Sequence, residues 1–327
     1  MGTNTLYSLN ILKQLKESGI IESTKAHIVI KNFEKLLEEE CQPARQTEKQ
    51  GKKKGRKKHS YKDFERSRGI FMIDLQAHIR LSKEDAAKYA ILPGDPGRID
   101  HIKTFLTESK ELAYNREMRS VSGYYKGLKV LAVSTGMGGA STGIAVEELH
   151  NIGVKYMIRI GSCGGLDPRM KFGDLLIVNG AVRDEGASKA YIDSIYPAIP
   201  DTELLISVLE AANECKVPFF IGKARSHDSF YIDNEEEISK YWSGKGIMGS
   251  DMETAALFTI GALRGVKTAS ILNTVVEYEG NLAEEINGYV DGEASMKQGE
   301  KNEILLALEA FVKEENKINN KRRGYYE

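Results

Sequence analysis

From about Ile70 onward, short apolar runs alternate with longer segments whose hydrophobic residues recur at helical spacing. The short runs, several of which end in glycine or a small polar residue, predict buried strands. The longer segments predict amphipathic helices, and this alternation indicates an α/β fold with a mixed, mainly parallel sheet flanked by helices. The predicted strands are 89–95, 130–136, 156–165, 174–182, 219–226 and 269–276, and the predicted helices include 202–214, 252–265 and 301–315.

The first 70 residues have a different character. Apolar residues at helical spacing, such as Leu9 and Leu12 and later Ile28 and Ile30, predict a helical N-terminal extension over residues 1–44. Residues 45–70 then form a basic linker, and residues 71–327 form the main domain.

The linker contains seven Lys or Arg residues and no acid between positions 49 and 58. Such a run repels itself and cannot bury a core, so it predicts a disordered tether. The same charge could instead bind an anionic partner, either RNA or a membrane surface.

Bulk composition excludes several classes of protein. The formal net charge is -1, so the chain as a whole has no electrostatic bias toward nucleic acid or membrane. Cys41, Cys163 and Cys215 are widely spaced and predict neither a disulfide framework nor a CxxC metal pair. No apolar run approaches the ~18 residues of a membrane helix, and a reducing cytoplasmic setting is the simplest interpretation.

Two glycine-rich strand ends carry arginines. In LPGDPGR (92–98), Gly94 allows close backbone approach and Arg98 can bind an anion with two hydrogen bonds. The alternative is a tight turn with a solvated arginine. In IRIGSCGG (158–165), Arg159 stands inside an apolar strand, where it needs either a bound anion or an internal ion pair.

Two further segments combine helix starts with polar groups. STGMGGASTGIAVEEL (134–149) places glycines after a strand, with Ser141 and Thr142 as caps of a helix whose N-terminus favours an anion. GSDMETAAL (249–257) sets Asp251 and Glu253 at a helix start, either as caps or as acceptors for sugar hydroxyls.

Taken together, these segments resemble the hexameric purine-nucleoside and uridine phosphorylases. STGMGGASTGIAVEEL fits the family signature at every specified position, and LAYNREMRS (112–120) and AVRDEGAS (181–188) follow the family's order. The resemblance covers about residues 76–315. It makes 71–327 a nucleoside phosphorylase domain and implies a homodimer with shared active sites or a homohexamer.

The resemblance implies roles for individual residues. Arg159, Glu253 and Glu277 are the candidate catalytic residues. Phosphate is expected at Gly94, Arg98, Arg159 and Ser162, together with Arg116 from a neighbouring subunit. The ribose is expected at His78, Asp251, Met252 and Glu253, and the base at Phe230, Asn234, Glu236 and Gly164.

The implied reaction is phosphorolysis of a nucleoside. Breaking the bond between ribose and base builds positive charge on the ribose, which a bound phosphate can stabilise and attack. No organic cofactor is expected, and inorganic phosphate is the co-substrate. Glu117, Met137 and Ser141 match positions that form a potassium site between subunits in some uridine phosphorylases.

The base-binding segment departs from the uridine branch. A Gln and an Arg are expected after Phe-Tyr, but FYIDNEEE places Asn234 and Glu236 there. Glu277 is the nearest acid to the aspartate that protonates the base in the purine branch, and burial would raise its pKa. Uridine is the favoured substrate, and a purine nucleoside is the alternative.

Two other functions compete. One is a nucleoside hydrolase on the same fold, against which Arg98, Arg116 and Arg159 argue. The other is a catalytically degenerate binding or regulatory module that acts through its basic N-terminal region.

Overall fold

The computed structural model describes residues 21–23, 28–30, 75–280 and 294–323. The chain divides into two compact units, Met1–Phe71 and Met72–Glu327. In the first unit, strands β1 (Ile21–Ser23) and β2 (Ile28–Ile30) pair antiparallel. The helix predicted at Ile28 and Ile30 is therefore wrong, because this β-branched run adopts the extended backbone that it favours. The rest of 1–44 and all of 45–70 lie outside the described residues.

The second unit is built on a nine-stranded sheet in the order β10-β9-β8-β11-β7-β3-β6-β5-β4. The pairs β10–β9, β9–β8, β11–β7, β7–β3 and β3–β6 are parallel, whereas β8–β11, β6–β5 and β5–β4 are antiparallel. This confirms the predicted mixed, mainly parallel sheet. The strands are β3 (Tyr89–Pro93), β4 (Thr107–Asn115), β5 (Met118–Tyr125), β6 (Leu128–Val133), β7 (Tyr156–Gly165), β8 (Leu175–Asp184), β9 (Phe219–His227), β10 (Ile247–Asp251) and β11 (Lys267–Val276).

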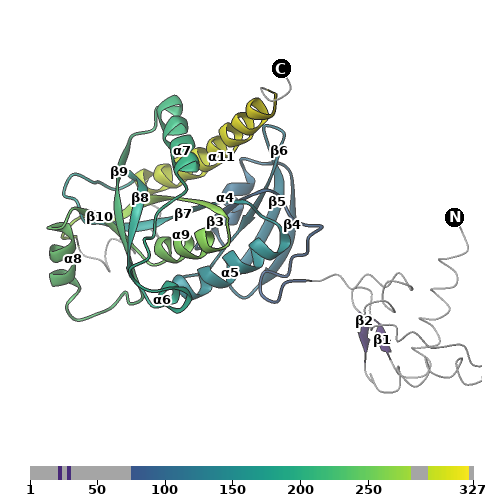
Figure 1. Ribbon diagram of the computed structural model, residues 1–327, viewed down its shortest axis with the longest axis horizontal. Helices are drawn as coiled ribbons and strands as arrows, with labels where there is room; N and C mark the ends of the chain where they lie inside the picture. The colour runs from purple at the N-terminus through teal and green to yellow at the C-terminus, as the bar shows by residue number, and fades with distance from the viewer. Residues whose placement is uncertain (1–20, 24–27, 31–74, 281–293, 324–327) are drawn as a thin grey trace, which may run out of the picture. The chain divides into compact units, whose positions relative to one another are not determined.

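Helices cover both faces of this sheet (Figure 1). Buried residues of α5 and α9 pack in one core with Leu92 and Met157, while α4, α7 and α11 pack in a second core with Ile91 and Ile158. Alternate residues of a strand point to opposite faces, which is why neighbours in β3 and β7 enter different cores. The helices are α4 (Arg98–Lys103), α5 (Gly139–Ile152), α6 (Ala187–Tyr191), α7 (Thr202–Cys215), α8 (Glu235–Ser243), α9 (Thr254–Leu263) and α11 (Ala294–Arg323).

The start of α5 differs from its sequence prediction. Ser141 and Thr142 do not cap this helix, since it begins at Gly139 and its N-cap is Gly138. Gly138 has φ 90°, a conformation that a residue with a Cβ rarely adopts, so glycine makes the turn into the helix. The Ser141 hydroxyl lies instead 2.8 Å from Glu117 Oε1 and 2.5 Å from Thr135 O.

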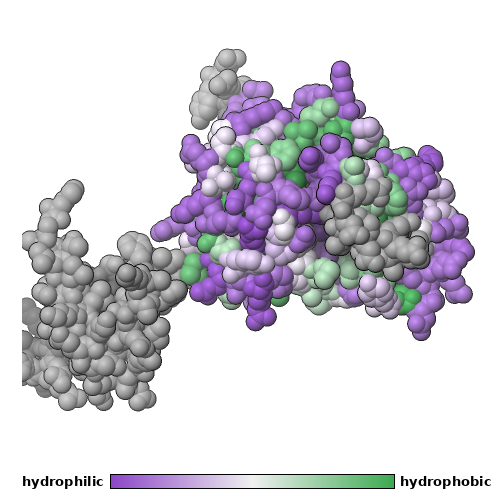
Figure 2. Space-filling model, turned by 180° about the vertical axis from the view of Figure 1, so that it is seen from behind, coloured by the Kyte–Doolittle hydropathy of each residue, from purple (hydrophilic) through white to green (hydrophobic). Residues whose placement is uncertain are grey.

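The surface of the second unit is mainly hydrophilic, with apolar residues gathered in separate patches (Figure 2). Across the described residues, no helix is both long and apolar enough to span a membrane.

Candidate active site

Two adjoining cavities lie at the carboxyl ends of the strands, where ligands bind in open α/β sheets. The larger has a volume of about 470 Å³ and the smaller about 410 Å³. Five residues from the ends of β7, β9, β10 and β11 and from the loop after β9 line both cavities. They are Gly164, His227, Phe230, Ser250 and Val276.

Arg159 of β7 is buried at the floor of the larger cavity. Its Nε donates to Asp251 Oδ2 at 3.1 Å, and its Nη2 lies 2.5 Å from Glu253 Oε2. Burial opposes the charge on Arg159, but Glu253 and Asp251 outweigh burial and raise its pKa. Gly161 must be small here, because a Cβ at that position would stand 2.5 Å from Arg159 Nη2. Of the two alternatives for Arg159, the internal ion pair is therefore present. Arg159 also lines the larger cavity, so the second alternative, a bound anion, stays open.

Arg98 approaches the same cavity from α4, and its guanidinium is tied to acids of α11. Its Nη2 donates to Ser162 Oγ at 2.6 Å, and its Nη1 donates to Glu303 Oε1 at 3.1 Å. Glu300 Oε2 lies 3.3 Å from Arg98 Nε, and Glu303 Oε2 accepts from the Gly161 backbone N–H at 3.0 Å. Arg98 is thus a buried, positioned cation and not a solvated one.

Burial raises the pKa of Glu303 to about 8, against the opposing effect of Arg98. The sequence analysis missed Glu300 and Glu303. The sequence could have indicated them, because Glu300 and Glu303 precede Ile304 on an otherwise apolar helix face. An unpaired carboxylate is costly on such a face, so these acids need a partner.

Glu253 lies at the start of α9 and lines the larger cavity with Met252. Glu253 Oε1 accepts from the Gly138 backbone N–H at 2.6 Å, and burial raises its pKa against the effect of Arg159. Asp251 lines the cavity too, but its oxygens already accept from Arg159, from the Ser226 hydroxyl at 2.6 Å and from Thr254. Asp251 therefore helps to position Arg159. The ribose contacts of Asp251, Met252 and Glu253 stay predictions.

The predicted base-binding residues divide into two groups. Phe230 and Gly164 line both cavities, and their contact with a base stays a prediction. Asn234 is exposed, lines neither cavity and is the N-cap residue of α8, so its predicted contact with the base has no support. The Glu236 side chain is at the rim of the smaller cavity, but it is 80% exposed and pairs with Lys240 one helical turn away.

Glu277 lines the smaller cavity without being the buried carboxylate that was expected. Its side chain is 26% exposed, and Oε2 accepts from Lys171 Nζ at 2.8 Å. Glu277 follows the end of β11, where solvent and Lys171 reach it. His227, at the end of β9, and Ser250, in β10, line both cavities but were not identified from the sequence.

Comparison with known proteins agrees with this geometry. The model of the Phosphorylase superfamily matches residues 88–311. The chain belongs to this superfamily. It is 35% identical to the uridine phosphorylase of Thermococcus kodakarensis over 248 residues, which are 72% of this chain and 85% of the relative. It is 42% identical to the purine nucleoside phosphorylase of Plasmodium vivax over 201 residues, covering 61% and 82%.

A solved structure extends the comparison to the fold. The uridine phosphorylase of Vibrio fischeri ES114 superposes with a TM-score of 0.70 at 42% identity, over 75% of this chain and all of that one. The family resemblance predicted from the motifs is confirmed, and the sheet described above is the phosphorylase fold.

In this phosphorylase, the residues that the resemblance assigns to subunit contacts fall into two groups. Some line the larger cavity, and the others lie outside both cavities. Glu117 and Met137 line the larger cavity, and Ser141 contacts Glu117. Arg116 is exposed at the β4–β5 turn, outside both cavities, and the His78 backbone N–H and Nδ1 both bond Glu148. A phosphate contact of Arg116, a ribose contact of His78 and a potassium site at Glu117, Met137 and Ser141 stay predictions.

Proposed function

We propose that this chain is a cytoplasmic nucleoside phosphorylase that transfers the ribose of a nucleoside to inorganic phosphate. The observation that carries the proposal is the pairing of Arg159 with Glu253 on the floor of the larger cavity, with Arg98 and Ser162 beside it. Two buried guanidinium groups suit an anion, and the neighbouring carboxylate suits vicinal hydroxyls.

The proposed mechanism follows from the charge arrangement. Phosphate held by Arg98, Arg159 and Ser162, with the Gly94 loop beside it, lies under the ribose that Glu253 and Met252 orient. As the bond to the base breaks, the phosphate stabilises the positive charge on the ribose and attacks it. Preorganised charges in a site shielded from water contribute most of such an effect, and no organic cofactor takes part.

Uridine is the proposed substrate. Support comes from the uridine phosphorylases among the similar proteins, including the Thermococcus and Vibrio enzymes. A purine nucleoside is the second candidate, because the Plasmodium vivax relative of 42% identity carries a purine nucleoside phosphorylase name. In the proposed assembly, at least a homodimer, Arg116 and His78 complete a neighbour's site.

The proposal is tested by following the release of free base from uridine, thymidine, inosine, guanosine and adenosine, each with and without phosphate. We expect base and ribose 1-phosphate only when phosphate is present. Release that does not depend on phosphate would make the protein a hydrolase. Absence of release from every nucleoside would favour the degenerate binding module.

A further inference from the structure

The arginines of the larger cavity are surrounded by an excess of acids. Arg98 and Arg159 line the cavity, and both side chains are buried. Four carboxyl groups contact these two cations. They are Asp251 and Glu253 at Arg159, and Glu300 and Glu303 at Arg98. With all four ionised, the cluster carries a net negative charge and repels an anion. Anion binding is therefore favoured when one of these acids is protonated.

Glu303 lies behind the cavity and is not part of its wall. Its side chain is fully buried and is not among the residues that line the cavity. The two groups that it bonds do line the cavity. Oε1 accepts from Arg98 Nη1 at 3.1 Å, and Oε2 accepts from the Gly161 backbone N–H at 3.0 Å. Arg98 Nη2 in turn donates to Ser162 Oγ at 2.6 Å. Glu303 can therefore act on a bound anion through Arg98 and Gly161.

Charged groups from three elements face Glu303. Arg98 from α4 and Arg159 from β7 favour its ionised form, whereas Glu300 on α11 itself opposes it. His101 acts at one remove, since its Nδ1 bonds Glu300. Burial has the largest effect and raises the pKa of Glu303 to about 8. Glu303 therefore changes its charge between about pH 7 and 9.

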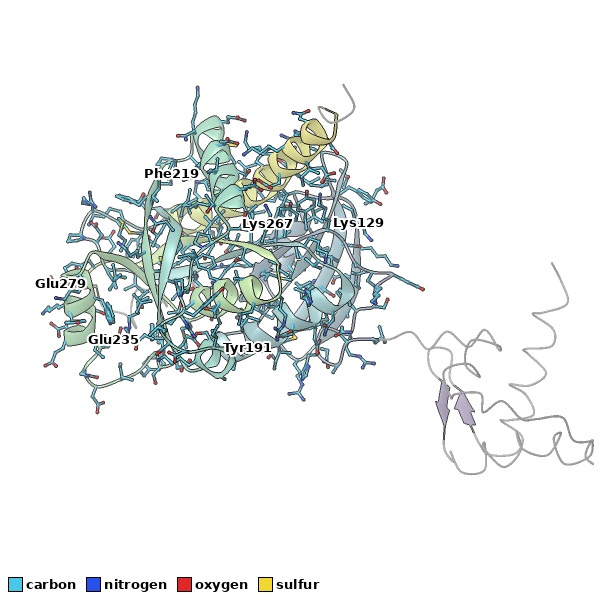
Figure 3. All side chains as sticks on the ribbon, viewed as in Figure 1. Lys129, Tyr191, Phe219, Glu235, Lys267 and Glu279 are labelled. Carbon is cyan, nitrogen blue, oxygen red and sulfur yellow. The ribbon has the colours of Figure 1, made fainter. Side chains whose placement is uncertain are left out.

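The other groups near α11 add little to this balance among the described residues. Burial raises the pKa of the Cys163 thiol to about 12, so that it stays neutral. β3 contains no charged residue. In β11 the charged residue is Lys267, at the end of the strand beside α7 (Figure 3), whereas the opposite end of β11 lines the cavity. The ion pairs between α11 and α7 involve Lys313 and Lys317, about three helical turns or more beyond Glu303.

We propose that Glu303 is a positioning residue that sets how tightly the larger cavity binds phosphate. In its neutral form, Glu303 still accepts from Arg98 and leaves the positive charge of Arg98 to the phosphate. In its ionised form, it compensates that charge itself, and phosphate must compete with it. The inference rests on the proposed function for the identity of the anion. Phosphate binding should therefore weaken as the pH rises and Glu303 loses its proton.

The physical cause is the repulsion between two negative charges that share one guanidinium group. An anion at Arg98 disfavours the ionised form of Glu303, so anion binding is accompanied by the uptake of a proton. The coupling is reciprocal, because a proton on Glu303 strengthens anion binding by the same factor by which the anion strengthens proton binding. A purely structural role of Glu303 would produce no such link between protons and anions.

The test measures the binding of sulfate by calorimetry at about pH 6.5 and about pH 9. Sulfate resembles phosphate in shape but keeps the same charge over this range, whereas phosphate titrates. We expect the parent to bind sulfate at least about fivefold more weakly at the higher pH. Glu303→Gln resembles the neutral carboxyl group, and its affinity should change by less than about twofold. At the higher pH, the variant should bind sulfate more tightly than the parent.

Glu309→Gln is the matched control, because it removes an acid of the same helix that bonds Lys126 and Tyr125 instead of Arg98. Its sulfate affinity should follow the pH dependence of the parent. His101 and His227 are present in all three proteins, so their titration cancels in the comparison. Parallel pH profiles for the parent and Glu303→Gln would overturn the proposal.

A second measurement needs no variant. Calorimetry of the parent in two buffers with different ionisation enthalpies gives the number of protons taken up when sulfate binds. Near pH 8 we expect an uptake of up to about half a proton. Proton release, no proton exchange or no sulfate binding at any pH would each overturn the proposal. Because sulfate binding needs no nucleoside, proton uptake supports the role of Glu303 even if no nucleoside is cleaved. Efficient phosphorolysis without proton uptake would remove this role and leave the proposed function intact.

Discussion

At the scale of single residues, the site is a set of buried charges that hold one another in place. Arg159 is paired with Asp251 and Glu253, and Arg98 is paired with Glu300 and hydrogen-bonded to Glu303. Removing one partner from such a pair leaves a buried charge uncompensated, which costs about 3–5 kcal/mol. The acids therefore fix both guanidinium groups in the cavity before any anion arrives.

Glu303 makes the stability of the fold depend on pH. Its pKa is about 8 in the folded protein and near 4.5 when exposed, so the folded state binds more protons between these values. Its stabilising contribution is complete below pH ~4.5 and is lost as the pH rises to about 8. Between pH 5.5 and 8, we expect the free energy of unfolding to fall less in Glu303→Gln than in the parent, as measured by urea denaturation.

Glu309 on the same helix is the control. Burial raises its pKa, but hydrogen bonds from Lys126 and Tyr125 outweigh burial and lower it. Glu309 therefore stays ionised throughout this range, and Glu309→Gln should change stability by a constant amount from pH 5.5 to 8. Parallel pH profiles for the parent and Glu303→Gln would contradict the assignment to Glu303.

The sequence predicted many of the cavity residues but few of their partners. Arg98, Arg159 and Ser162 could be found because each follows or interrupts an apolar strand. Glu303 could not, because it is 142 residues from Gly161 along the chain and only the packing of α11 brings them together. His227 was missed because a histidine at a strand end has many uses that the sequence does not distinguish.

At the scale of elements, most of the apolar strands could be predicted, whereas the short strand β10 and the polar strand β4 could not. The strands that the sequence predicted have apolar runs, because most of their residues are buried. They are β3, β6, β7, β8, β9 and β11. β4 has the sequence TESKELAYN and is largely exposed, so neither alternation nor an apolar run marks it. It is a strand because it pairs with β5, a long-range contact that local patterns do not encode.

The approach of α11 to the sheet depends on a glycine. Gly299 is buried on α11, and a Cβ there would overlap Asn273 Oδ1 of β11 and stand 2.8 Å from the Gly173 carbonyl oxygen. Asn273 Nδ2 also donates to Met296 O at 2.8 Å, which ties helix and strand together. We expect Gly299→Ala to lower the free energy of unfolding by about 1–3 kcal/mol, despite alanine's better helix propensity.

Gly244→Ala is the matched control for this substitution. Gly244 ends α8 with φ -63°, and a Cβ there would meet only backbone oxygens at 3.4 and 3.5 Å, which is ordinary contact. We expect a change within about 0.5 kcal/mol by urea denaturation. Equal effects of the two substitutions would show that α11 can shift to make room.

At the scale of the whole molecule, the candidate active site belongs to one unit. Every residue placed here in either cavity lies within Met72–Glu327, as does the family match at 88–311. The basic run at 49–58 lies outside the described residues, and its proposed roles as a tether or as a binding segment stay predictions. A tether only connects the two parts of the chain, whereas a binding segment attaches the protein to an anionic partner.

We expect a protein that begins at Met72 to fold and to keep phosphorolysis within about threefold of the full chain. The physical reason is that the cores around both faces of the sheet are built from residues after position 75. Retaining Met72 also retains His78, which the proposed shared site requires. Circular dichroism and the phosphate-dependent release of base are the measurements. A folded but inactive protein would show that residues 1–71 complete the site.

The protein that begins at Met72 also tests the role of the basic segment. Its binding to immobilised RNA is compared with that of the full chain over a salt series. Seven cations with no acid among positions 49–58 attract phosphates and release counterions, so retention should fall steeply as salt increases. A full-length variant with these seven residues replaced by serine separates charge from chain length. We expect RNA retention at low salt by the parent, with loss of retention in both the truncated and the serine-substituted proteins. Equal retention of all three would rule out nucleic-acid binding by this segment and leave the tether or the binding of a membrane surface as its role.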